Sequence, residues 1–196
     1  MRAAARITRH SATARRAVLM LALLLVAAAP AVADARRYVI QRETSEVSFR
    51  ATSRLMNADG RFHHVRGEVV VEPTDITTAR VAVTLEVASI DTGIGLRDSH
   101  LRSADFFDVE RFPDIIFESI RVEGAGRRAT VTGRLTMRGV TQEVAVPVDL
   151  TLSETALVAT GELVVNRRDF GMHYNSFVNP VGNEVRVSFT IRARAS

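Results

Sequence analysis

The feature that most constrains this chain is an alternation of apolar and polar side chains that recurs from residue 46 to residue 192. Apolar residues take every second position in residues 46–51 and 81–88. The same period returns at 131–137, 144–152, 157–165 and 185–192. Successive side chains of a β-strand point to opposite faces, so this period predicts strands with one buried and one solvated face. Many short antiparallel strands of this kind must pair off their edges, and we therefore expect an all-β antiparallel barrel.

Turn residues separate the alternating segments, and no linker divides them. Asp59-Gly60, Arg138-Gly139 and Pro180–Asn183 are typical turn sequences. Residues 34–196 contain no repeat or low-complexity tract, so we expect them to form a single domain that buries its own core. The chain has no cysteine, and stability must therefore come from that core rather than from disulfides.

Residues 1–33 have the pattern of a cleaved secretory signal peptide. Five arginines and no acidic residue precede the apolar run Val18–Ala29, and the small residues Ala31-Val32-Ala33 follow it. The run is shorter than the roughly 20 residues that span a bilayer. We therefore expect cleavage near Ala33 and export to the periplasm, by either the general secretory or the twin-arginine route.

Cleavage changes the charge of the chain. All 26 basic residues are arginine, against 22 acidic residues, and five of the arginines lie in residues 1–33. The rest of the chain then has a net charge close to −1. Nucleic-acid binding depends on a clustered basic surface, so we expect no nucleic-acid partner.

The histidines and charged clusters give little support to metal binding or catalysis. His63 and His64 are adjacent and so point to opposite faces of a strand, which disfavours shared ligation of one ion. Asp98 and His100, with Arg97 beside them, could form an acid–base pair, but the chain has no GxSxG motif and no cysteine. We expect no metal, no cofactor and no enzymatic activity.

One short helical segment is predicted near residues 98–105. Asp98 could cap its first amides, while Leu101 and Phe106 could face inward. Arg97 and His100 would then pair with neighbouring acids or backbone carbonyls, or contact a polar head group at the mouth of the barrel.

Ser89–Ser119, Gly133–Val144, Asp169–Gly171 and Gly182–Phe189 are the segments with the most specific sequence patterns. Together they resemble the YceI-like family, whose members are periplasmic, lipocalin-like barrels that hold polyisoprenoid lipids. The resemblance extends over nearly everything from Tyr38 to the C-terminus. It implies a lipocalin-like barrel of about eight strands with an isoprenoid lipid or quinone as its ligand.

The interior of a barrel of about eight strands either fills with side chains or keeps room for one small ligand. The small inward residues Ala51, Gly133, Ala159 and Gly161 are compatible with a cavity, although glycine in a strand also marks a bend. The family resemblance favours a cavity. We expect its apolar tunnel to be lined by Phe49, Leu85, Phe106, Phe117, Leu135, Met137, Phe170 and Met172. We expect its mouth, where a head group would lie, to carry Arg97, Asp98, His100, Phe107, Phe112, Arg168 and Phe177.

The expected function is the carriage, storage or protection of an amphiphile with a long isoprenoid tail, such as a quinone or a polyprenyl phosphate. The tail would supply most of the affinity, with tolerance toward head groups, although the extra positive charge in Asn166–Asp169 would favour an anionic one. A fatty-acid or fatty-amide carrier and a solid-cored envelope stress or interaction protein are the alternatives. Transient contact with a membrane surface or a membrane cytochrome stays open, as does the oligomeric state, including a homodimer.

Overall fold

The computed structural model describes residues 34–174 and 180–196. The predicted signal peptide and Phe177 lie outside the described residues. The strands are β1 (Arg36–Ile40), β2 (Glu46–Ser53), β3 (Ala58–Phe62), β4 (Val65–Glu72), β5 (Asp75–Glu86), β6 (Ile90–Asp91), β7 (Asp114–Ala125), β8 (Arg128–Met137), β9 (Val140–Leu152), β10 (Ala156–Asn166) and β11 (Val181–Ala195). The helices are α1 (Gly95–Arg102) and the short 3₁₀ helices η1 (Arg42–Thr44), η2 (Val87–Ser89) and η3 (Arg167–Phe170).

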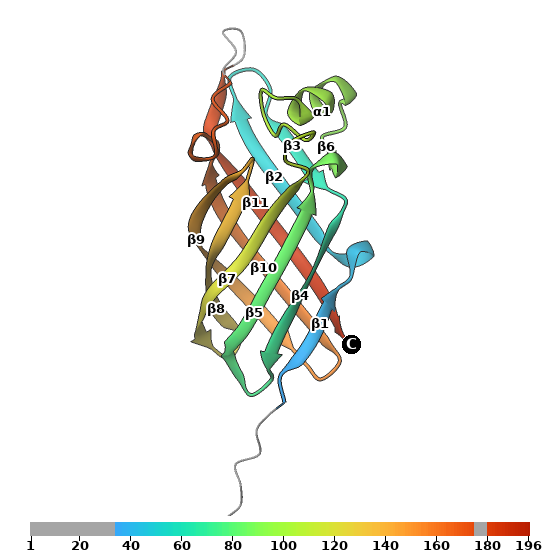
Figure 1. Ribbon diagram of the computed structural model, residues 1–196, viewed down its shortest axis with the longest axis vertical. Coiled ribbons are helices and arrows are strands. Elements are labelled where there is room, and N and C mark those ends of the chain that lie inside the picture. Colours follow the sequence, from blue (N-terminus) through green and yellow to red (C-terminus); the bar gives the residue numbers. More distant parts are fainter. Residues whose placement is uncertain (1–33, 175–179) are drawn as a thin grey trace, which may run out of the picture. The chain divides into compact units, whose positions relative to one another are not determined.

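The strands form one antiparallel sheet that closes on itself. Three consecutive pairs, β1 with β2, β3 with β4 and β5 with β6, act as single interrupted strands. β11, for example, pairs with β2 through residues 181–190 and with β1 through residues 193–195. β4 likewise pairs with β1 and β5, while β3 pairs with β2 and β6. The barrel therefore has eight strand positions in consecutive order, and the expected all-β antiparallel barrel is confirmed (Figure 1).

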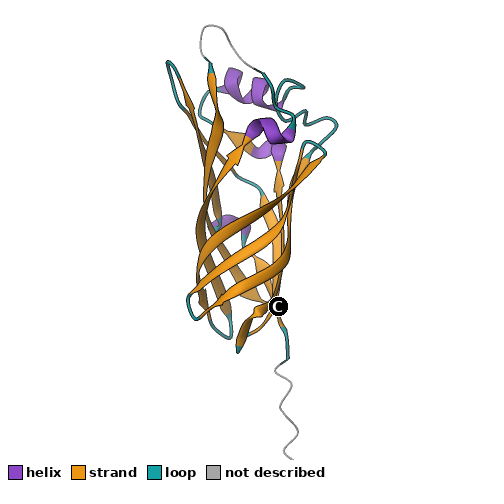
Figure 2. Cartoon of the chain, turned by 90° about the vertical axis from the view of Figure 1, so that its left-hand side faces the viewer, coloured by secondary structure: helices purple, strands orange, loops and turns teal. Residues whose placement is uncertain are grey.

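The two ends of the barrel differ. One end carries α1, η3 and the connection between β2 and β3, and we call it the helical end (Figure 2). The other end carries the short connections β4–β5, β7–β8 and β9–β10, and we call it the turn end. Arg138 ties the parts of the helical end together, because it donates hydrogen bonds to Ala104 O (2.8 Å) and Gly171 O (2.6 Å).

The helix lies earlier in the chain than predicted. It spans Gly95–Arg102 rather than 98–105, and its N-cap, Ile94, makes no side-chain capping bond. The predicted capping role of Asp98 was wrong, because Asp98 lies inside the helix and its carboxylate turns back to accept from Thr92 N at 2.9 Å. Within the described residues, no helix combines the length and the hydrophobicity needed to cross a membrane.

The inward glycines make room for aromatic rings. A Cβ placed on Gly133 would lie 2.5 Å from Phe117 Cζ, and one on Gly161 would lie 2.6 Å from Phe189 Cζ. Phe189 is the direct cross-strand neighbour of Gly161. These glycines therefore leave space for phenylalanine rings to pack over the backbone of a neighbouring strand, which is a known way of packing glycine within a sheet. The sequence had suggested a cavity or a bend at these positions.

Replacing Gly161 with valine is expected to destabilise the barrel by about 1–3 kcal/mol, because the new side chain would collide with Phe189 and with Pro147 O, 2.6 Å from the Cβ position. The shift in the midpoint of denaturant unfolding measures this effect. Gly95→Ala is the control, since nothing lies within 4 Å of its Cβ position. Equal stability of Gly161→Val and the wild type would contradict the packing role.

Candidate functional site

The barrel encloses a cavity of about 520 Å³, within the size range of small-molecule sites. The inward faces of the long strands line it, including Val81, Val83 and Leu85 of β5 and Val185 and Val187 of β11. The period-two pattern therefore identified the inward side of these strands correctly. The interior is hollow rather than solid, the choice that composition alone had left open.

Most of the expected tunnel residues lie on the cavity wall. These are Phe49, Leu85, Phe106, Phe117, Leu135, Met137 and Met172. Phe170 does not line the cavity. It belongs to η3 and is buried at 2 % exposure in the main hydrophobic core.

The expected mouth residues divide into two groups. Arg97, His100 and Phe107 line the cavity. Asp98, Phe112 and Arg168 are not among the residues that line it.

Asp98 and Phe112 make contacts away from the cavity, and Arg168 is exposed to solvent. The carboxylate of Asp98 accepts hydrogen bonds from Thr92. Phe112 covers the β8–β9 turn, where a Cβ on Gly139 would lie 2.7 Å from its ring, and the guanidinium of Arg111 stacks on that ring at 5.0 Å. Arg168 is exposed, one residue past the inward position. Phe177, the last expected mouth residue, lies outside the described segments.

Among the described residues, the polar side chains on the cavity wall come from the helical end. They are Arg97 and His100 of α1, Arg167 of η3, and Tyr174 just after η3. The remaining wall is apolar. The site is therefore amphipathic along the barrel axis, with hydrogen-bonding groups at the helical end and a hydrocarbon surface toward the turn end.

Arg167 is the functional candidate that the sequence analysis missed. Its side chain is only 4 % exposed and donates to three backbone carbonyls: Nε to Gly182 O (3.0 Å), Nη1 to Met172 O (2.5 Å) and Nη2 to Val181 O (3.1 Å). Burial lowers its pKa, and the neighbouring Arg168 lowers that pKa further. A signal was present, because Leu163, Val165 and Arg167 continue the inward period of β10.

The residues of the suspected acid–base pair serve separate contacts. His100 Nε2 lies 3.0 Å from Asp105 Oδ2, and its ring packs edge-on against Phe106 and Tyr174, with centroids 5.1 and 4.7 Å away. Arg97 donates from Nε to Thr92 Oγ1 (2.8 Å) and from Nη2 to Thr92 O (2.9 Å). Asp98 and His100 do not pair with each other, so the geometry required for an acid–base pair is not formed.

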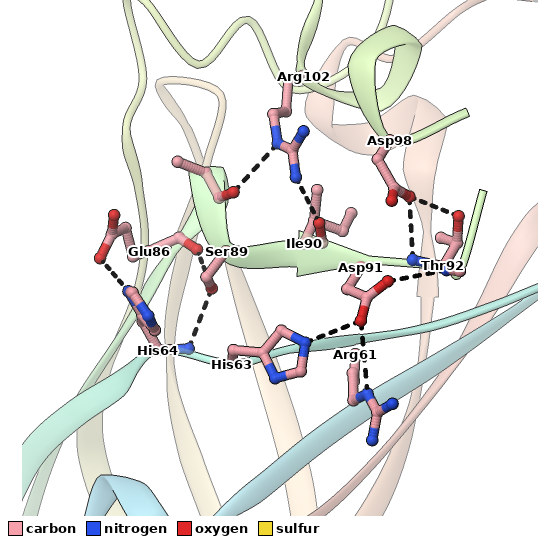
Figure 3. A network of polar contacts seen from close by, with 12 residues as sticks. Arg61, His63, His64, Glu86, Ser89, Ile90, Asp91, Thr92, Asp98 and Arg102 are labelled. Atoms are coloured by element: carbon pink, nitrogen blue, oxygen red, sulfur yellow. Dashed lines mark hydrogen bonds and ion pairs between the residues drawn. The ribbon is translucent and has the colours of Figure 1, made fainter. Parts of the chain in front are cut away.

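A polar network supports the strand interruptions beneath α1 (Figure 3). His63 Nε2 lies 2.9 Å from Asp91 Oδ2 and His64 Nδ1 lies 2.7 Å from Glu86 Oε2, so the adjacent histidines contact different carboxylates. These hydrogen bonds lower the pKa of Asp91 and of Glu86. Arg102 joins α1 to β6 by donating to Ile90 O at 2.6 Å.

The described residues contain no cluster of metal-ligating side chains. Across residues 34–174 and 180–196, no group of three or more His, Asp or Glu side chains is placed to hold a metal ion.

Asp98→Ala is expected to lower the free energy of unfolding by about 1–3 kcal/mol, because it removes the acceptor for the part-buried amide of Thr92. Denaturant unfolding measures this loss. Asp98→Asn keeps an acceptor oxygen and is the matched control; equal loss in both variants would contradict this explanation.

Comparison with known proteins agrees with this architecture. The family model for the YceI-like domain matches residues 38–193. The chain belongs to the YceI-like family. Among solved structures, this YceI-like barrel is similar to BcnA of Burkholderia cenocepacia, with a TM-score of 0.73 and 25% identity, covering 79% of this chain and 99% of that chain.

Two further relatives of this YceI-like chain come from other bacteria. A polyisoprenoid binding domain from Saccharophagus degradans, implicated in plant cell wall breakdown, shares the fold with a TM-score of 0.66 at 16% identity, over 81% of this chain and 98% of that one. A UPF0312 protein of Pseudomonas aeruginosa is 38% identical over 91 residues, which is 46% of this chain and 48% of the relative. The chain thus spans about half the length of such curated relatives.

Proposed function

We propose that this YceI-like barrel binds an amphiphile with a long isoprenoid tail, of the quinone or polyprenyl phosphate type. The observation that carries the proposal is the amphipathic cavity, whose wall is apolar apart from the polar groups at the helical end. The polyisoprenoid-binding description of the Saccharophagus degradans domain supports the ligand class. The head group would lie near α1 and the tail would extend toward the turn end.

The energetics of a buried tail suit this cavity. Each methylene removed from water contributes about 0.8 kcal/mol, so a few isoprene units offset the cost of immobilising a ligand. The branched side chains of valine and leucine dominate the wall, and such a surface accepts a hydrocarbon by shape rather than by hydrogen bonding. The tail would then supply affinity and the helical end would orient the ligand.

The proposed role is that of a periplasmic carrier that performs no chemistry of its own. The signal pattern of residues 1–33, with cleavage near Ala33, supports export. A carrier in an aqueous compartment must shield a tail that water excludes, and an enclosed apolar barrel does this. Carriage, storage and protection of the lipid all rest on that same property.

The test is to purify the protein from its own periplasm without detergent, denature it, and identify the extracted molecules by mass spectrometry. A stoichiometric polyprenyl compound is the expected result. A straight-chain lipid would instead favour a fatty-acid or fatty-amide carrier, since the apolar wall accepts either tail. Recovery of no lipid, from a protein that also fails to take up long-chain quinones, would contradict lipid binding.

A further inference from the structure

We infer that Arg167 forms a binding site for an acidic head group, so that the preferred lipid carries a phosphate or a similar oxyanion at the helical end. This inference rests on the proposed function and narrows its ligand class. It concerns a residue at the cavity wall that is buried, positively charged and not balanced by a carboxylate.

The charge of Arg167 has no counter-ion in the protein. None of the ion pairs among the described residues includes it, whereas arginines on the outer surface, such as Arg50, Arg66 and Arg186, each pair with a carboxylate. Residues 1–33 and 175–179 contain no Asp or Glu, so no undescribed carboxylate can balance it. A buried charge without a partner is unfavourable, and a bound anion would remove that cost.

The guanidinium of Arg167 keeps donors for a ligand. It has five N–H groups, and the carbonyls of Met172, Val181 and Gly182 each accept one bond. These carbonyls fix the orientation of the side chain and leave the remaining N–H groups available. Guanidinium groups bind phosphate and carboxylate oxygens through short, charge-assisted hydrogen bonds, so a fixed guanidinium at the cavity wall is suited to an oxyanion.

Arg97 has a different electrostatic setting. It shares Thr92 with the buried carboxylate of Asp98, because both side chains bond to Thr92 Oγ1. The charge of Arg97 is therefore partly balanced within the protein. Among the described residues no carboxylate pairs with Arg167, and the cation of Arg168 adds positive charge beside it, so Arg167 is the stronger anion site at this end.

Two lipids with the same tail and different head groups test the inference. We would compare a polyprenyl monophosphate with the corresponding polyprenol by titration into the lipid-free protein at physiological salt. The expected result is that the wild type prefers the phosphate by about 10–100-fold, the range of hydrogen bonds to charged groups. Arg167→Met should lose this preference and keep its affinity for the polyprenol.

Matched variants separate head-group binding from a structural role. Arg168→Met removes a neighbouring exposed charge and should keep the preference. Arg167→Lys retains the charge without the planar fork and should keep part of it, which provides a measurement if Arg167→Met does not fold. Retention of the full preference for the phosphate in Arg167→Met would show that Arg167 only holds the backbone, and it would overturn the inference. A full preference together with an unchanged phosphate affinity in Arg167→Lys would overturn it likewise.

The outcomes also distinguish this inference from the function on which it rests. Equal affinity of the wild type for the two lipids would overturn the acidic head group while leaving lipid binding intact. Failure of the wild type to bind either lipid would overturn both. Inorganic phosphate alone should not bind measurably, because the tail supplies most of the affinity; tight binding of the free ion would show that the site does not serve a lipid.

Discussion

Ala159→Phe is expected to weaken lipid binding by at least about 100-fold while the barrel stays folded. Ala159 faces the cavity from the middle of β10, and its cross-strand partners are Leu150 and Ile191. A phenyl ring at this position would occupy space that we assign to the tail. Exclusion of one five-carbon isoprene unit forfeits up to about 4 kcal/mol of transfer free energy, and a loss of about 2.8 kcal/mol already corresponds to a factor of 100 in Kd.

Titration with a long-chain quinone measures this loss, and circular dichroism with denaturant unfolding shows whether the barrel is intact. Thr160→Phe is the matched control. It adds the same ring on the same strand one residue away, where the side chain is exposed on the outer face. Wild-type affinity in Ala159→Phe would show that the ligand does not lie in the barrel interior.

Affinity is expected to rise steeply with tail length and then reach a plateau. Each isoprene unit that enters the apolar cavity adds up to about 4 kcal/mol, so successive units should each improve Kd by up to about 1,000-fold until other costs dominate. The plateau should begin when the tail fills the cavity of about 520 Å³, because further units stay in water or at the barrel end.

A series of quinones with one ring and increasing tail length measures this dependence. A parallel series of polyprenyl monophosphates should show the same slope, displaced toward higher affinity if Arg167 binds the head group. Equal affinity for short and long tails with the same head group would contradict a cavity filled by the tail. The Ala159→Phe variant is expected to reach its plateau at a shorter tail.

The strand pattern was predictable because it depends on local geometry. In β5, β10 and β11 the apolar face follows from the period of two, and the cavity wall bears out that assignment. The helix was less predictable. Asp98 has the chemistry of a capping residue, but its carboxylate bonds to Thr92, and α1 begins at Gly95 without a side-chain cap. Helix ends depend on such competing contacts, which a sequence pattern does not rank.

The candidate head-group residues show the same division. The sequence drew attention to the basic pair Arg167-Arg168, of which Arg168 was expected at the mouth. In the structure Arg167 continues the inward face of β10 and is buried, whereas Arg168 falls on the exposed side of η3. The period of two would have selected Arg167 had it been extended past the end of the strand.

The sequence by itself determined the class of fold, the inward faces of β5, β8, β9, β10 and β11, and the membership of the family, because each depends on spacing along the chain. Tertiary structure decided that the interior is hollow, since that depends on how side chains from all the strands fill a closed space. It also decided that Arg97, His100, Arg167 and Tyr174 meet at one end. Their convergence requires closure of the barrel by β1 and β11 and the docking of α1, and both depend on contacts between residues distant in sequence, such as the bond from Arg97 of α1 to Asn57 O.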